Sequence, residues 1–231
     1  MALKALSIEV RDPTTLSGSE IDELYGLFRT AFQADRRGFE LDLLEKHKVL
    51  TVRTEEGLSA FTSLRLYTPE AEVRVFYSGD TFAGPQARIG HKLPSLWARY
   101  VFKEIGPKQA TRDFWLLLCS GFRTYRILPV CFQRYVPGPG GPDSLLRQRD
   151  RWASALFGQS FQNGVVIPPR ATPLYQPEPP KRLKNDSAVR RFAELNPGYS
   201  QGHELVCLVS LDPQNLTPAG RRLVEGGAPP S

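Results

Sequence analysis

The stretch "SGDTFAGPQARIGHKLPSLW", residues 78–97, decides how the chain is organised. An apolar run ends in it, a loop of small residues follows, and a segment with helical periodicity begins near Leu93. Arg88, His91 and Lys92 stand where the positive end of the helix dipole disfavours cations. A bound anion reverses that effect, because it meets unpaired N–H groups and cations together. The stretch therefore predicts a phosphate-holding loop, and the alternative is that the basic side chains point into solvent.

The residues before this loop predict one strand, two helices and three further strands. Strand-like segments occupy residues 4–12, 48–54, 58–68 and 72–82, with turns at 55–57 and 69–71. Apolar residues repeat at helical spacing over 17–33, where Ser17 with Glu20 or Ser19 with Asp22 can form a capping box. A shorter helix is expected over 39–47. The short turns favour an antiparallel meander.

The residues after the loop predict a helix over 93–104 and a strand buried on both faces in "DFWLLLCSG", 113–121. Residues 122–136 begin as a helix that Pro129 is expected to interrupt. A helix over 144–161, a proline-rich surface segment over 164–184, a helix over 186–198 and a strand over 203–211 follow. This order defines a mixed α+β fold.

Composition limits the class of protein. The 231 residues are 41% hydrophobic, which suits a globular protein of one large domain or two small ones. No apolar stretch reaches the ~18 residues of a spanning helix, and the N-terminus lacks a long apolar signal core, so we expect a cytoplasmic protein. Three separated cysteines and three scattered histidines favour neither disulfides nor a metal site. A net charge of +6 favours anionic partners, although it also fits a soluble basic surface.

The order of elements, with "QARIGHK" (residues 86–92) after the fourth strand, resembles the GNAT superfamily of N-acyltransferases over residues 4–135. The segments "FYSGDT", "GFRTYRILP" and "NPGYSQGHEL" resemble a bacterial subgroup of GNAT-like proteins. The resemblance implies a mostly antiparallel sheet that splays between its fourth and fifth strands, flanked by helices. It also implies that the arm of acyl-CoA, or of an acyl-phosphopantetheine carrier, enters the splay and pairs with strand backbone.

The resemblance places donor contacts along the fourth strand and the loop. The expected contacts there are Thr81, Phe82, Ala83, Gln86, Arg88, Gly90, His91 and Lys92. Beyond the fifth strand it adds Cys119, Arg123 and Arg126. An acidic acyl carrier protein is a possible donor that suits the basic charge, with no metal required.

Acyl transfer to an amine needs a base and an acid for the leaving thiolate. Asp80, at the end of the fourth strand, is a candidate base, or else part of a hydrogen-bonded bulge. Tyr125 is a candidate acid whose pKa Arg123 and Arg126 would lower, or else a packed aromatic residue. His203, next to Glu204, is a further candidate base, or else lies at an exposed strand end.

Two classes of function remain open from these residues. The first is an N-acyltransferase that moves an acyl group from a thioester donor to the amine of a small molecule or amino acid. The second is a non-catalytic nucleic-acid or carrier-protein module, in which Phe122, Tyr125 and Tyr135 stack bases. A GNAT-like fold recruited to another activity in specialised metabolism is a third possibility.

We expect one core over residues 1–135. Two further segments complete this core: a helix and a proline-rich segment over 136–185, and a helix and a strand over 186–216. Residues 217–231 are expected to be a disordered tail.

Overall fold

One mixed sheet organises the protein, with its eight strands in the order β1-β2-β3-β4-β5-β8-β7-β6. The computed structural model describes residues 7–83, 93–105, 112–168, 174 and 178–225. The strands are β1 Ser7–Arg11, β2 Lys48–Thr54, β3 Gly57–Glu70, β4 Val73–Ala83, β5 Arg112–Cys119, β6 Phe161–Gln162, β7 Val165–Val166 and β8 Glu204–Ser210. The predicted α+β class and mostly antiparallel sheet are confirmed.

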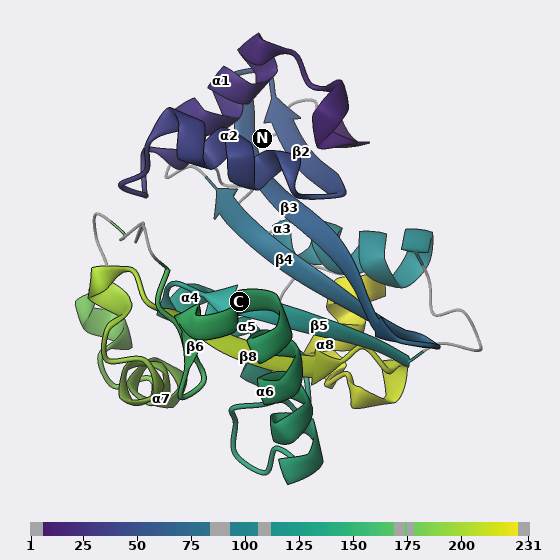
Figure 1. Ribbon diagram of the computed structural model, residues 1–231, viewed down its shortest axis with the longest axis vertical. Helices are drawn as coiled ribbons and strands as arrows, with labels where there is room; N and C mark the ends of the chain where they lie inside the picture. The colour runs from purple at the N-terminus through teal and green to yellow at the C-terminus, as the bar shows by residue number, and fades with distance from the viewer. Residues whose placement is uncertain (1–6, 84–92, 106–111, 169–173, 175–177, 226–231) are drawn as a thin grey trace.

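Helices cover both faces of this sheet (Figure 1). The helices are α1 Gly18–Phe28, α2 Arg36–Leu44, α3 Leu93–Arg99, α4 Phe122–Tyr125, α5 Ile127–Cys131, α6 Asp143–Phe157, α7 Ser187–Leu195 and α8 Pro218–Glu225. One face packs against α1, α2 and α6, and the other against α3, α4, α5, α7 and α8. None of the described helices is long and apolar enough to span a membrane.

Helix starts follow local chemistry. Ser17 accepts a hydrogen bond from the Glu20 N–H, while the Glu20 carboxylate accepts one from the Ser17 N–H, so this pair forms the capping box at α1. Asp35 caps α2 through the Gly38 N–H, and Asp186 caps α7 through two backbone N–H groups. The starts of α1 and α7 agree with the predicted helices, because each capping side chain bonds within its own turn. The second helix was expected over 39–47, but α2 begins at Arg36 and ends at Leu44.

Strands β4 and β5 form a parallel pair, joined by the crossover that contains α3. Near the first residues of this strand pair, Arg74 of β4 donates two hydrogen bonds to Asp113 of β5. The Nε–Oδ1 distance is 2.9 Å and the Nη2–Oδ2 distance is 2.6 Å. Both side chains are nearly buried, at 11% and 8% exposure. A two-point bond of this kind fixes register as well as contact. The pair therefore ties β4 to β5 where the strands begin.

Three expectations about the second half of the chain were wrong. The helical break falls at Arg126, and Pro129 lies inside the short helix α5, where the preceding break removes the need for its N–H. Residues Val165–Val166 are not a surface segment but a buried strand, because they pair with Leu205 and Glu204 of β8. The expected disordered tail contains α8, which packs against α3 and α5.

We predict that Asp113→Asn lowers the free energy of unfolding by about 3 kcal/mol, because it removes the carboxylate charge that pairs with the nearly buried Arg74 guanidinium. Urea unfolding measures the loss. The matched control is Glu45→Gln at the exposed Arg65–Glu45 pair, which we expect to cost less than ~1 kcal/mol. Equal losses in the two variants would contradict a special role for Arg74 and Asp113.

Candidate functional site

The candidate site lies where β4 and β5 separate. Their pairing runs from Val73 opposite Arg112 to Ser78 opposite Leu117. Beyond that point β4 continues through Ala83 in contact with β3, while β5 continues to Cys119 in contact with β8. Figure 1 shows the two strands diverging from this point. The predicted splay between the fourth and fifth strands is confirmed.

A β-bulge marks the start of the divergence. Leu64 pairs with Ser78 and Thr62 pairs with Thr81, so Ser63 alone lies opposite Gly79 and Asp80. An extra residue bends the bulged strand and increases its twist. The bulge thus turns β4 away from β5, and the interpretation of Asp80 as part of a bulge is confirmed for its backbone.

Gly79 is required by a lysine that lies against it. A Cβ at this position would be 2.7 Å from Lys46 Cε and 3.1 Å from Ser63 Oγ. Any side chain would therefore push Lys46 out of its place beside the bulge.

Ser78, the last β4 residue that pairs with β5, is held from the face of the sheet that α3 covers. Trp115 Nε1 donates a buried hydrogen bond of 2.8 Å to Ser78 Oγ. Trp97 of α3 stacks on Trp115, with ring centroids 3.9 Å apart. The separation point is therefore held by an aromatic contact from the crossover helix.

A carboxyl group lies beyond the last β5–β8 pair, at the open end. Glu204 begins β8, and its Oε1 accepts a hydrogen bond of 2.6 Å from Ser120 Oγ, just after β5. Burial raises the pKa of Glu204; the Ser120 hydrogen bond opposes this shift, the Asp42 carboxylate adds to it and the Lys46 ammonium opposes it. A carboxyl group with a raised pKa beside an open strand end is a candidate for proton exchange.

A buried lysine lies on the other side of the opening. Lys46, 5% exposed, follows α2, and its Nζ is 2.6 Å from Asp42 Oδ1 and 5.4 Å from the Tyr77 ring centroid. The fully buried Ser63 hydroxyl has no hydrogen-bond partner within the described part of the chain. We call Asp42, Lys46, Ser63, Ser120 and Glu204 the polar cluster.

The polar cluster lies on one face of the sheet. Tyr77 and Val206 pack in the core beneath α6, and strand alternation puts Gly79 and Glu204 on that same face. The cluster therefore lies on the face of the sheet that α2 and α6 cover, while Trp97 and Trp115 pack on the opposite face.

The predicted donor contacts are only partly described. Gln86, Arg88, Gly90, His91 and Lys92 lie outside the described residues, as do the side chains of Asp80 and Ala83. Thr81 is exposed, with its Oγ1 2.7 Å from Thr62 Oγ1, and Phe82 packs edge-on against Phe32. The backbone of residues 79–83 lies beyond the last residue that pairs with β5.

The expected lowering of the Tyr125 pKa was wrong. Tyr125 is 1% exposed, its hydroxyl donates to the Pro137 carbonyl at 2.8 Å, and burial raises its pKa. The flanking arginines act elsewhere: Arg126 pairs with Asp186 at 3.1 Å, and Arg123 lies over the Phe122 ring. This arrangement is that of a core residue.

Two other predicted residues are also held in structural contacts. Cys119 is fully buried with its Sγ 3.8 Å from Cys207 Sγ, and burial raises its pKa, so it presents neither a thiolate nor an open surface. The ring of His203 lies against Gly198, and its carbonyl accepts a hydrogen bond from Asn196.

The expected base-stacking surface was wrong. Phe122, Tyr125 and Tyr135 are 4%, 1% and 6% exposed, so their rings face the core rather than a strand of nucleic acid.

The sequence did not identify Asp42, Lys46, Ser63 and Ser120 as a group. The four lie in three separate parts of the chain, and none belongs to a motif. The glycine at position 79, inside an otherwise bulky strand, was the one local signal of a close approach.

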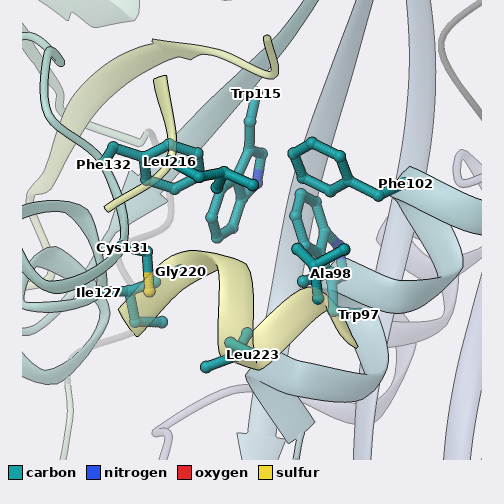
Figure 2. Close-up of a pocket in the computed structure, with 11 residues that line it drawn as sticks. Trp97, Ala98, Phe102, Trp115, Ile127, Cys131, Phe132, Leu216, Gly220 and Leu223 are labelled. Carbon is teal, nitrogen blue, oxygen red and sulfur yellow. The ribbon is translucent and has the colours of Figure 1, made fainter. Parts of the chain in front are cut away.

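A small apolar hollow lies on the opposite face, between α3, α5 and α8. Figure 2 shows Trp97, Phe102, Trp115 and Leu223 around it. It measures about 290 Å³ with its open rim, but its enclosed part is near the size of one water molecule. Its lining has almost no polar surface, so the hollow presents apolar side chains and not an acid or a base.

No protein-family model matches the sequence, and no curated protein matches it. Among solved structures, an acyl-CoA N-acyltransferase from Pseudomonas aeruginosa aligns at 17% identity and TM-score 0.38, covering 48% of this chain and 79% of that one. A GNAT family N-acetyltransferase from Escherichia coli in complex with CoA aligns at 14% identity and TM-score 0.41, covering 65% and 76%. N-acetylglutamate synthase from Neisseria gonorrhoeae, complexed with coenzyme A and N-acetyl-glutamate, aligns at 12% identity and TM-score 0.39, covering 91% and 36%.

These are similarities of architecture, and at such identities and TM-scores they assign no activity or residue role to this chain. The mostly antiparallel sheet and the separation of β4 from β5 are those that the resemblance to the GNAT superfamily implies.

We predict that Glu204→Gln raises the melting temperature at pH 7–8. Because the pKa of Glu204 is raised in the folded state, the unfolded chain loses this proton at a lower pH than the folded chain does. The free energy of unfolding of the wild type therefore falls as the pH rises from the ordinary glutamate pKa to the pKa of folded Glu204. The amide removes that cost and keeps an acceptor for Ser120. Melting curves from pH 4 to pH 8 should show a gain that vanishes at low pH. A gain that does not vary with pH would contradict the raised pKa.

Proposed function

We propose that this protein is an N-acyltransferase that moves an acyl group from a thioester donor to an amine by direct attack. The observation that carries the proposal is the separation of β4 from β5 directly beside a carboxyl group with a raised pKa. Backbone that can hold an extended donor arm therefore lies next to a group that can remove a proton.

The donor side of the proposal rests on β4. Beyond Ser78, residues 79–83 continue without pairing to β5, so their peptide groups on that side can bind the amide-rich arm of coenzyme A or of a carrier protein. The net charge of +6 favours either anionic donor. The loop with Arg88, His91 and Lys92 follows β4 in sequence, and phosphate binding there stays a prediction.

The proton transfers assign a role to Glu204. The Glu204 carboxylate takes one proton from the acceptor ammonium, and the amine nitrogen then forms a bond to the thioester carbonyl carbon. The C–S bond breaks, and the second proton from nitrogen goes to the thiolate sulfur. The products are an amide and a thiol, and Glu204 returns its proton to water.

Asp80 is the second candidate base, because its backbone lies in the bulge on the other side of the opening. His203 adjoins Glu204 in sequence and is the third.

We expect Glu204→Gln to lower kcat about 10²-fold or more, which is typical of losing a general base, and to remove the acidic limb of the pH profile. Steady-state rates with an acyl-CoA and a panel of primary amines measure this. Glu194→Gln, a change of the same kind at an exposed residue of α7, should leave the rate unchanged. Full activity of Glu204→Gln together with loss of activity in Asp80→Asn would move the base to Asp80.

We expect acyl-CoA, coenzyme A or a holo acyl carrier protein to stabilise the fold by ~2.7 kcal/mol at 100 times its dissociation constant. Thermal melts with each donor, and with an oligonucleotide as control, test this. Stabilisation by the oligonucleotide alone would contradict the proposal and favour a nucleic-acid-binding module.

A further inference from the structure

Two carboxylates lie on opposite sides of the opening between β4 and β5. Asp42 belongs to α2, which packs through Phe39 and Leu43 on the part of the sheet formed by β2 and β3. Glu204 begins β8, which belongs to the part formed by β5, β7 and β8. Because pairing between the two parts ends at Ser78 and Leu117, the two side chains approach from opposite sides.

Each carboxylate has one oxygen held within its own side of the opening. Asp42 Oδ1 accepts from Lys46 Nζ and Glu204 Oε1 accepts from Ser120 Oγ, both at 2.6 Å. Within the described residues, no hydrogen bond reaches Asp42 Oδ2 or Glu204 Oε2. The two bonded groups therefore orient the carboxylates and leave an acceptor oxygen on each.

A further polar atom in the same place has no partner. The Ser63 hydroxyl is fully buried beside Gly79 and Lys46, without a hydrogen bond in the described part of the structure. Buried polar atoms without partners are uncommon in folded proteins, and a group that binds beside them is one explanation. Lys46 neutralises one of the two carboxylates, so the cluster keeps a net negative charge when Glu204 is ionised.

We propose that Asp42 and Glu204 form a subsite that binds the acceptor as an alkylammonium with no carboxylate beside its amine. This inference rests on the proposed function and narrows its acceptor class. A primary ammonium can donate to both second oxygens, while a carboxylate on the adjoining carbon would meet the net negative charge of the cluster. Like charges placed against each other at a binding interface are disfavoured.

The two carboxylates have different roles. Asp42 is half-exposed and ion-paired with Lys46, so it holds the ammonium. Glu204, in the less exposed position, takes the proton once the ammonium is bound. Asp42 is thus a binding residue, and its loss should change KM more than kcat.

The test uses acceptors that differ by one carboxylate beside their single amine: tyramine and tyrosine, and tryptamine and tryptophan. With an acyl-CoA donor, we expect kcat/KM of the wild type to favour the decarboxylated member of a pair at least tenfold. Asp42→Asn should raise KM for that member about tenfold, leave kcat within about threefold, and reduce the preference. Asp22→Asn, at an exposed carboxylate of α1, is the matched control and should change neither.

Calorimetric binding of the same amines, without donor, separates this inference from the proposed function. Selective binding of an amine that Asp42→Asn abolishes, without any turnover, would support the subsite and overturn the acyltransferase. Turnover with equal or better use of the amino acids would overturn the subsite and keep the acyltransferase. If the wild type binds none of the amines, the subsite is also overturned.

Discussion

At Ser63, one residue of β3 lies opposite two residues of β4, and the opening in the sheet depends on that mismatch. Before it, β4 is tied to β5 by backbone pairing, by the Arg74–Asp113 ion pair and by the Trp115–Ser78 hydrogen bond. After it, β4 stays with β3 and leaves β5. The extra residue of a bulge bends its strand and increases the local twist.

The bulge also explains why charged groups gather there. In a continuous sheet, neighbouring strands satisfy each other's peptide groups and leave no space between them. Where two strands separate, polar side chains can occupy the space between them. Gly79 lets Lys46 approach the bulge, Lys46 holds Asp42, and the ends of β5 and β8 place Ser120 and Glu204 opposite. Glu204 is buried there with one oxygen hydrogen-bonded to Ser120, and burial raises its pKa. The strand geometry at the opening is therefore also the cause of the raised pKa.

Much of the fold could be predicted because its signals are local. Helices α1, α6 and α7 follow from apolar spacing, with caps such as Ser17 and Asp186 at α1 and α7, and β5 follows from its apolar run. The failures have a common cause. Val165 and Val166 are too few to show a period, and α8 begins at a proline in a segment whose helical state depends on packing against α3 and α5.

The sequence by itself determined the α+β order and the basic charge, because periodicity, turns and composition are readable along the chain. The position of the splayed strands was implied by the resemblance to the GNAT superfamily. Only the tertiary structure decided which polar groups meet at the opening. Tyr125 and Cys119 lie close to it in sequence but turn into the core, while Asp42 and Glu204 are 162 residues apart and come from opposite parts of the sheet. Strand separation, and not spacing along the chain, sets which side chains share a site.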